Sequence, residues 1–210
     1  MTPPDRPSLP KQDNLNIAVS RGLAALRGQS DEQLAWLGAN RDDQGRIRVP
    51  VLGEPMSVDF EAGGLIFENG DPVDMRWQVL VVHYLAAPDP VEPSGAEMVF
   101  ADIPETRGYQ GVYEGRVIKR LCFTVGRTAD ILDRAARAIG GEPCADEGDL
   151  AFRFQVLPRI SLRVVWYAGD EDFPPNAVFL FQSNVVHLLP PEDIIVLSEL
   201  VVGRMARAAK

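Results

Sequence analysis

The chain has 210 residues, of which 46% are hydrophobic and 24% are charged, a composition that is ordinary for a globular protein with one full core. Its formal net charge of -9 argues against a nucleic-acid-binding surface, because contact with phosphates needs a basic stripe, and it also disfavours anionic membranes. No apolar run approaches the length of about 18 residues that a membrane-spanning helix requires. We therefore expect a soluble protein that binds neither nucleic acid nor a membrane.

The cysteines and the first residues indicate where the protein resides. Cys122 and Cys144 are the only cysteines, and they belong to no CxxC or Cys/His cluster. Two lone thiols favour a reducing cytosol over a disulfide framework, although a disulfide between them stays open at the level of sequence. The first ten residues, MTPPDRPSLP, hold four prolines and lack the apolar segment of a signal peptide. We expect a flexible proline-rich tail over residues 1–13, one domain over residues 14–210, and a cytoplasmic location.

The N-terminal part of the domain is expected to hold two helices followed by two strands. Apolar residues recur at helical spacing from Asn14 to Arg27. Ser30 and Gln33 then form a capping-box pattern, in which each side chain would bond the other residue's backbone N–H at the start of a short second helix. Alternating apolar residues predict strands over residues 46–51 and 56–60.

The middle of the chain predicts a buried helix and, further on, two more. Asp71 is expected to cap the first of them, with Pro72 at its first position, and the mostly apolar run that follows makes it the central helix of the core. A strand is expected over residues 97–103. Helices are expected over residues 112–123 and 127–139, the second of which has a clear apolar stripe.

The last part of the chain carries the strongest strand pattern. Residues 150–156 and 160–167 are separated by a step short enough for an antiparallel hairpin, and residues 177–181 predict another strand. Residues 190–193 open a final helix, with acids at its positive end. Because the element order lacks regular strand–helix–strand alternation, we predict an α+β fold: an antiparallel-dominated mixed sheet packed by helices, with a helical N-terminal segment and a C-terminal helix.

Three consecutive carboxylates mark a candidate site after the strand at residues 160–167. Asp170, Glu171 and Asp172 lie on one turn, and flexible acidic loops supply the oxygen ligands that hard cations and cationic partners bind. The spacing is not that of an EF-hand. The more common role of such a turn is structural, with one acid bonding backbone amides, and a structural acid leaves its neighbours available for binding.

Histidine and aromatic residues extend this candidate site. His187 follows the strand at residues 177–181 and would join the carboxylates only if the acidic loop folds toward it. A lone His among Val and Leu is more often a packing residue, and two histidines without paired spacing do not predict a zinc site. Trp166 and Tyr167 alternate on their strand, so one is expected in the core and the other on the surface beside the acids, where it would line a groove.

No recognised catalytic motif accompanies these residues. The chain has no GxSxG, no P-loop, and no GxGxxG that opens a helix. Cys122 has Lys119 and Arg120 nearby, which would lower its pKa, but burial in its apolar run would leave the thiol inert, and we expect the latter.

Several short segments resemble an uncharacterised domain of about 200 residues in bacteria and archaea, many of them anaerobes. The matching segments are HYL at residues 83–85, LPRI at residues 157–160, WYAGDEDFP at residues 166–174 and PED at residues 191–193. The resemblance covers most of the chain after residue 15 and implies no established activity. Relatives sometimes occur beside iron–sulfur or corrinoid-related proteins, but this chain lacks the cysteines for such a cluster, so the resemblance assigns no cofactor.

The sequence thus predicts a binding or accessory module without catalytic activity, which uses an acid–aromatic loop around residues 166–175 to hold an unidentified protein or small molecule. The alternative is a small metal-assisted enzyme that uses the Asp170–Asp172 carboxylates and His187. No metal ligand set is assigned, and a homodimer is left open. The candidate binding residues are Trp166, Tyr167, Asp170, Glu171, Asp172 and His187.

Overall fold

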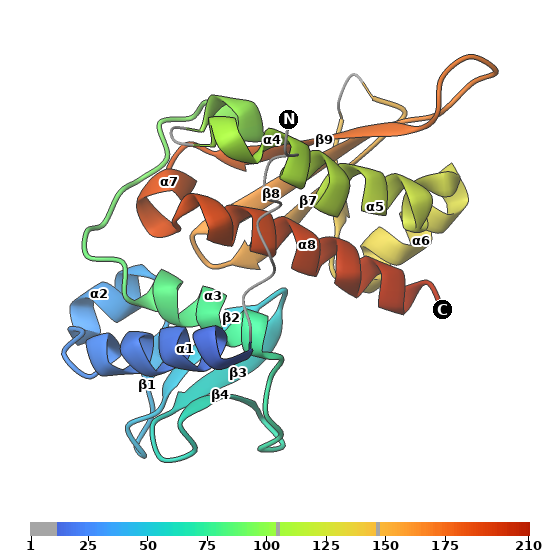
Figure 1. The fold of residues 1–210 in the computed structure, drawn as a ribbon. Helices are drawn as coiled ribbons and strands as arrows, with labels where there is room; N and C mark the ends of the chain where they lie inside the picture. Colours follow the sequence, from blue (N-terminus) through green and yellow to red (C-terminus); the bar gives the residue numbers. More distant parts are fainter. Residues whose placement is uncertain (1–11, 104–105, 146–147) are drawn as a thin grey trace, which may run out of the picture.

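The computed structural model describes residues 12–103, 106–145 and 148–210, and it combines helices with two antiparallel sheets (Figure 1). This confirms the predicted α+β class with a helix at each end. The predicted tail lies outside the described residues, except for Gln12 and Asp13, which begin the first helix. None of the described helices is long and apolar enough to cross a membrane.

The N-terminal half places two helices and a four-stranded sheet around a buried central helix. The sheet has the order β1-β2-β3-β4, and every pairing is antiparallel. The elements are α1 (Gln12–Leu26), α2 (Asp31–Trp36), β1 (Asn40–Arg41), β2 (Ile47–Val51), β3 (Glu54–Asp59), β4 (Gly64–Phe67) and α3 (Met75–Leu85). Most residues of α3 are buried, as its apolar sequence predicts.

Helix α3 begins three residues later than its sequence predicts. Asp74, and not Asp71, caps it by accepting a hydrogen bond from the backbone N–H of Arg76 at 3.0 Å. The prediction was wrong because Asp71 and its neighbours pair with β4 instead: the N–H of Phe67 donates to the carbonyl of Asp71 at 2.9 Å, and Pro72 forms a bridge with Ile66.

The capping box predicted for α2 is half confirmed. The Ser30 hydroxyl accepts a hydrogen bond from the N–H of Gln33 at 3.1 Å. The Gln33 side chain does not return to Ser30 but donates to the carbonyl of Ala87 at 3.1 Å, and Ser30 instead donates to the side chain of Gln29. The glutamine therefore ties α2 to the segment after α3.

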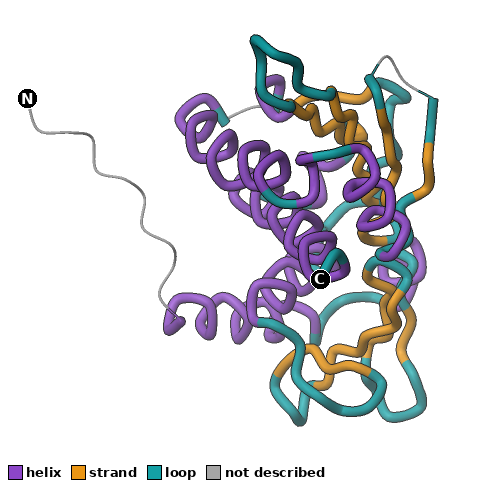
Figure 2. The backbone as a smooth tube through the Cα atoms, turned by 90° about the vertical axis from the view of Figure 1, so that its right-hand side faces the viewer, coloured by secondary structure: helices purple, strands orange, loops and turns teal. Residues whose placement is uncertain are grey.

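The C-terminal half is a five-stranded antiparallel sheet with helices packed against it. The strand order is β5-β9-β8-β7-β6, and β7 and β8 form the predicted hairpin. Figure 2 shows the helices gathered on one side of these strands. The strands and the last two helices are β5 (Glu97–Val99), β6 (Glu142–Pro143), β7 (Leu150–Leu157), β8 (Ile160–Tyr167), β9 (Asn176–Gln182), α7 (Val185–Leu188) and α8 (Pro191–Ala208).

The segment between β5 and β6 is helical with several interruptions. The strand predicted over residues 97–103 ends at Val99, because Phe100 turns into a 3-10 helix and stacks on Tyr113 with ring centroids 4.1 Å apart. The predicted helix over residues 112–123 is present, but a π turn breaks it. The elements are η1 (Phe100–Asp102), η2 (Arg107–Tyr109), α4 (Gln110–Tyr113), the π turn η3 (Glu114–Ile118), α5 (Lys119–Phe123), η4 (Val125–Arg127) and α6 (Ala129–Ala138).

The two halves share one continuous cluster of buried apolar side chains. Tyr84 joins them through its hydroxyl, which donates to the carbonyl of Leu37 at 2.6 Å and accepts from the N–H of Arg159 at 3.1 Å. The backbone N–H of Leu52, after β2, donates to the carbonyl of Val156 in β7 at 3.0 Å. These contacts place α3 against the hairpin and leave the opposite end of the β8–β9 pair free to carry a projecting loop.

Candidate functional site

The acidic loop between β8 and β9 folds back on itself at Asp170. Its Oδ1 atom accepts hydrogen bonds from the backbone N–H groups of Asp172 at 2.9 Å and Phe173 at 2.8 Å. Gly169 makes the fold possible, because a Cβ atom there would lie 2.7 Å from the Pro175 backbone nitrogen and 2.8 Å from the Phe173 carbonyl oxygen. Asp170 therefore has the structural role that acids commonly take in turns.

The other two acids of the turn are differently placed. Glu171 and Asp172 are both exposed, and among the described residues neither carboxylate takes part in an ion pair. The turn thus presents two charged groups to solvent beside Phe173, whose side chain is 70% exposed. We call residues 170–172 the acid turn.

Trp166 and Tyr167 lie on opposite faces of β8, as their alternation predicts. Trp166 is 3% exposed, and its indole N–H donates to the carbonyl of Gly126 in η4 at 3.0 Å. Tyr167 is 38% exposed. Because Tyr167 points to the other face of the sheet from Trp166, it does not join the hollow that the acid turn borders. Trp166 therefore has a structural role beneath the site and is not exposed to a partner.

His187 is separated from the acid turn by the length of a strand. It lies exposed on α7, after the last residue of β9, whereas the acid turn precedes the first residue of β9. The seven residues of β9 span about 20 Å, so His187 and the carboxylates cannot share a ligand. In the described residues, no group of three or more His, Cys, Asp or Glu side chains is arranged to hold a metal ion. The structure therefore does not bring His187 and the acid turn together.

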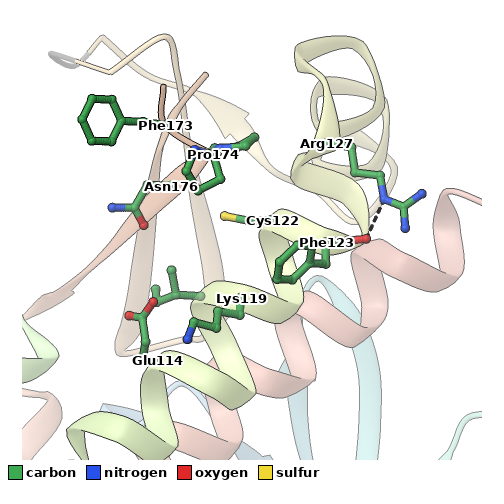
Figure 3. A pocket seen from close by; sticks show the side chains of 10 residues that line it. Glu114, Lys119, Cys122, Phe123, Arg127, Phe173, Pro174 and Asn176 are labelled. Carbon is green, nitrogen blue, oxygen red and sulfur yellow. Dashed lines mark hydrogen bonds between the residues drawn. The ribbon is translucent and has the colours of Figure 1, made fainter. Parts of the chain in front are cut away.

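A cavity of about 510 Å³ lies beside the acid turn, and we call it the aromatic groove (Figure 3). One wall is the segment Phe173–Asn176, and the other is the helix that contains α5. Both walls are mainly apolar. The groove is lined by Glu114, Ile118, Lys119, Cys122, Phe123, Arg127, Phe173, Pro174, Pro175 and Asn176.

Two large aromatic side chains at this groove are unusually exposed. Phe123 at the end of α5 is 65% exposed, comparable with Phe173 on the facing wall. Full burial of a Phe side chain would stabilise the protein by roughly 1.5–3 kcal/mol, and both residues forgo most of this in the isolated chain. Exposed aromatic residues that border a cavity are typical of binding surfaces.

Arg127, a polar residue at the edge of the groove, is fixed by a hydrogen bond to the backbone. Arg127 donates through Nε to the carbonyl of Phe123 at 2.6 Å, a bond drawn in Figure 3. Arg127 also borders a second, more polar hollow of about 670 Å³ that contains the acid turn and Asp149. Phe173 and the two prolines after it form the wall between the groove and this hollow. The acidic and apolar surfaces are therefore contiguous.

Cys122 lies in the groove but is not a poised nucleophile. Burial, reinforced by the charge of Glu114, raises the pKa of its thiol to about 11, so the thiolate is scarce near neutral pH. The predicted burial of Cys122 is confirmed. Both cysteines are free, so the disulfide left open by the sequence is not formed.

The residues that sequence reasoning missed are those supplied by α5 and η4. Phe123, Lys119 and Arg127 are 43 or more residues from Asn176 and the acid turn in the chain, and no local pattern links them. Of these residues, only Phe123 had a sequence feature that hinted at exposure. It is the last residue of an apolar helical run, and a turn follows it.

Comparison with known proteins assigns the chain to a family. The sequence model described as Domain of unknown function (DUF3786) matches residues 31–204, which include both walls of the aromatic groove and the acid turn. No curated protein and no solved structure matches the chain. Since the family match spans well over half of the chain, the protein belongs to the DUF3786 family, a domain of unknown function.

Proposed function

We propose that the protein is a soluble cytoplasmic binding module without catalytic activity of its own, which captures a segment of a protein partner. The segment carries an apolar side chain that enters the aromatic groove and basic side chains that pair with the acid turn. The observation that carries the proposal is the exposure of Phe173 between an apolar cavity and the two exposed carboxylates of Glu171 and Asp172.

The apolar part of the interaction rests on Phe123 and Phe173. A partner side chain inserted between them would remove both from water, and buried aromatic anchors commonly supply most of the energy of an interface. The groove is large enough for a Leu, Phe or Trp side chain.

The charged part rests on Glu171 and Asp172. Both lie within the polar hollow on the far side of Phe173, so a residue next to an inserted apolar side chain would reach them. Exposed carboxylates contribute to orientation and association rate more than to affinity. This favours a segment in which Lys or Arg flanks the apolar anchor.

The absence of catalysis is inferred from the chemistry of the groove residues. Its one thiol has a raised pKa, and His187 lies at the other end of β9. The length of β9 separates His187 from the acid turn, which favours the binding module over the metal-assisted alternative.

Fluorescence anisotropy with short labelled peptides tests the proposal. The peptides have a central Leu or Phe flanked on each side by Lys or Arg, and matched peptides replace the flanks with Glu or the centre with Ala. We expect the basic–apolar peptides to bind, and Phe173→Ala to weaken their binding by about tenfold or more. Glu171→Gln with Asp172→Asn should weaken it less and reduce its dependence on salt.

Two control variants make the test specific. Tyr167→Ala removes an exposed aromatic from the other face of β8, and Asp43→Asn with Glu61→Gln removes two exposed acids from the N-terminal half. Both should bind the peptides as the parent does. Equal binding of Glu-flanked and Lys-flanked peptides, or unchanged binding by Phe173→Ala, would contradict the proposal.

A further inference from the structure

A second cavity, unrelated to the aromatic groove, lies where the two halves of the protein meet. Its volume is about 620 Å³, and we call it the junction cavity. Helices α1 and α3 of the N-terminal half form one side, and the π turn η3 and helix α8 form the other. It is lined by Asn14, Leu15, Ala18, Asp74, Met75, Arg76, Val79, Arg116, Glu192, Asp193 and Val196.

The π turn presents Arg116 to helix α8. Its Nε and Nη2 atoms donate to the two carboxylate oxygens of Glu199 at 2.8 and 2.6 Å, and Nη1 donates to Glu192 at 3.1 Å. Glu192 and Glu199 are two turns apart on one face of α8, so one guanidinium spans both. π turns occur frequently at functional sites. Arg116 is therefore saturated by carboxylates and is a poor receptor for an anion.

Asp193 is the most buried charged group of the cavity wall. It is 6% exposed, and its Oδ2 atom lies 2.5 Å from Nδ1 of His83. Its other oxygen, Oδ1, has no hydrogen-bond partner in the described part of the chain, and neither has Oε2 of Glu192. Both residues lie in the first turn of α8. Each carboxylate thus uses one oxygen for a partner within the protein, Arg116 for Glu192 and His83 for Asp193, and leaves its second oxygen without a hydrogen bond among the described residues.

The charge of the surroundings is negative for either state of His83. The surroundings contain four carboxylates and two guanidinium groups, and protonation of His83 adds a single positive charge. The carboxylates are those of Asp74, Glu192, Asp193 and Glu199, and the guanidinium groups are those of Arg76 and Arg116. A cation is therefore favoured in the cavity and an anion is disfavoured.

Most of the remaining wall is apolar. Leu15 and Ala18 from α1, Val79 from α3 and Val196 from α8 come from three different helices and converge on the same space. A ligand that fills the cavity must place hydrocarbon against them and hydrogen-bond donors against α8.

We propose that the junction cavity binds a small organic cation, with a primary ammonium group held by the free oxygens of Asp193 and Glu192 and an apolar body against Leu15, Val79 and Val196. The ammonium supplies three donors, of which two would serve these oxygens and the third would face solvent. The ligand bridges the two halves of the protein, because it contacts α1 and α3 at one end and α8 at the other.

Isothermal titration calorimetry of the full chain tests this with a matched set of probes. The cationic probes are phenethylamine, tryptamine and hexylamine, and the comparison probes are 2-phenylethanol and 3-phenylpropionate, which replace the ammonium with a hydroxyl or a carboxylate. We expect at least one amine to bind and to raise the melting temperature, the alcohol to bind about tenfold more weakly, and the carboxylate not to bind. Glu192→Gln, at a partly exposed position, should weaken amine binding about fivefold or more.

Two substitutions in α1 locate the binding. Ala18→Phe fills the cavity from its wall and should abolish amine binding, whereas Ala24→Phe makes the same change at an exposed position away from the cavity and should leave it unchanged. Any one of three results would overturn the proposal. These are failure of all the amines to bind up to millimolar concentration, equal binding of amine and carboxylate, and retained amine binding in Ala18→Phe. Peptide binding at the aromatic groove is measured separately, so neither result decides the other.

Discussion

Asp170 and Phe173 are hydrogen-bonded to each other in both directions. The backbone N–H of Phe173 donates to the carboxylate of Asp170 at 2.8 Å, and the backbone N–H of Asp170 donates to the carbonyl of Phe173 at 2.8 Å. This pair closes the loop and fixes the backbone from which the exposed aromatic ring projects. Asp170 thus fixes the position of Phe173, which we propose contacts the partner, without having to contact the partner itself.

Asp170→Ala should therefore reduce both stability and peptide binding. Loss of the two side-chain hydrogen bonds should cost about 1 kcal/mol in the free energy of unfolding measured with urea. Asp170→Asn retains an acceptor oxygen and should recover most of that loss. Asp172→Ala should change stability by less than about 0.5 kcal/mol, since its carboxylate is exposed. A variant Asp170→Ala that binds peptides as the parent does would show that the turn does not position Phe173.

Gly126 should be intolerant of a side chain. A Cβ atom at this position would lie 2.8 Å from Cδ2 of Leu121 and 3.1 Å from Nε1 of Trp166, which donates to the Gly126 carbonyl. Gly126→Ala should lower the free energy of unfolding by about 1–3 kcal/mol, because the packed neighbours must shift. Gly111→Ala is the matched control: in helix α4 no heavy atom lies within 4 Å of the added Cβ, so stability should rise by up to about 1 kcal/mol.

Tyr84→Phe isolates the polar contact between the two halves. It removes only the hydroxyl that bonds the carbonyl of Leu37 and the N–H of Arg159, and it leaves the buried ring in place. The unpaired backbone groups should cost about 1–3 kcal/mol, measured by thermal unfolding. An unchanged melting temperature would mean that other groups satisfy Leu37 and Arg159.

The contact between His83 and Asp193 should make stability depend on pH. The hydrogen bond to Asp193 raises the pKa of His83, although partial burial opposes this. A raised pKa in the folded state contributes stability that is fully present below about pH 6.5 and is lost as pH rises through the folded value.

His83→Gln, which keeps a donor but does not titrate, provides the comparison. The parent should have its greatest advantage in melting temperature near about pH 6, and the difference should shrink toward about pH 9. A difference that is constant with pH would assign His83 a packing role only.

Local patterns in the sequence predict most elements, including the β7–β8 hairpin and the alternation that buries Trp166 and exposes Tyr167. They fail where a distant segment competes for the same groups. Asp71 has the sequence of a helix cap, but pairing with β4 takes its carbonyl first. Gln33 fits a capping box, but the carbonyl of Ala87 is the better partner because α3 brings it within reach.

The candidate site was predictable only in part for the same reason. The acid turn is local, and its structural acid follows from the preference of Asp for turns. The groove beside it needs Phe123 and Phe173 on facing walls, which depends on how α5 packs against the sheet. The distance of His187 from the acid turn depends on β9, which lies between them in the chain. Because β9 is an extended strand that leads directly away from the loop, it holds the two apart.

Amide chemical-shift mapping tests the proposed binding function most directly. Titration of the isotope-labelled protein with a Lys-flanked Leu peptide should shift the amide resonances of Lys119, Phe123, Asp172 and Phe173, while those of α7 stay in place. Shifts that cluster on the Tyr167 face of the sheet or at His187, with none at Phe123 and Phe173, would contradict it.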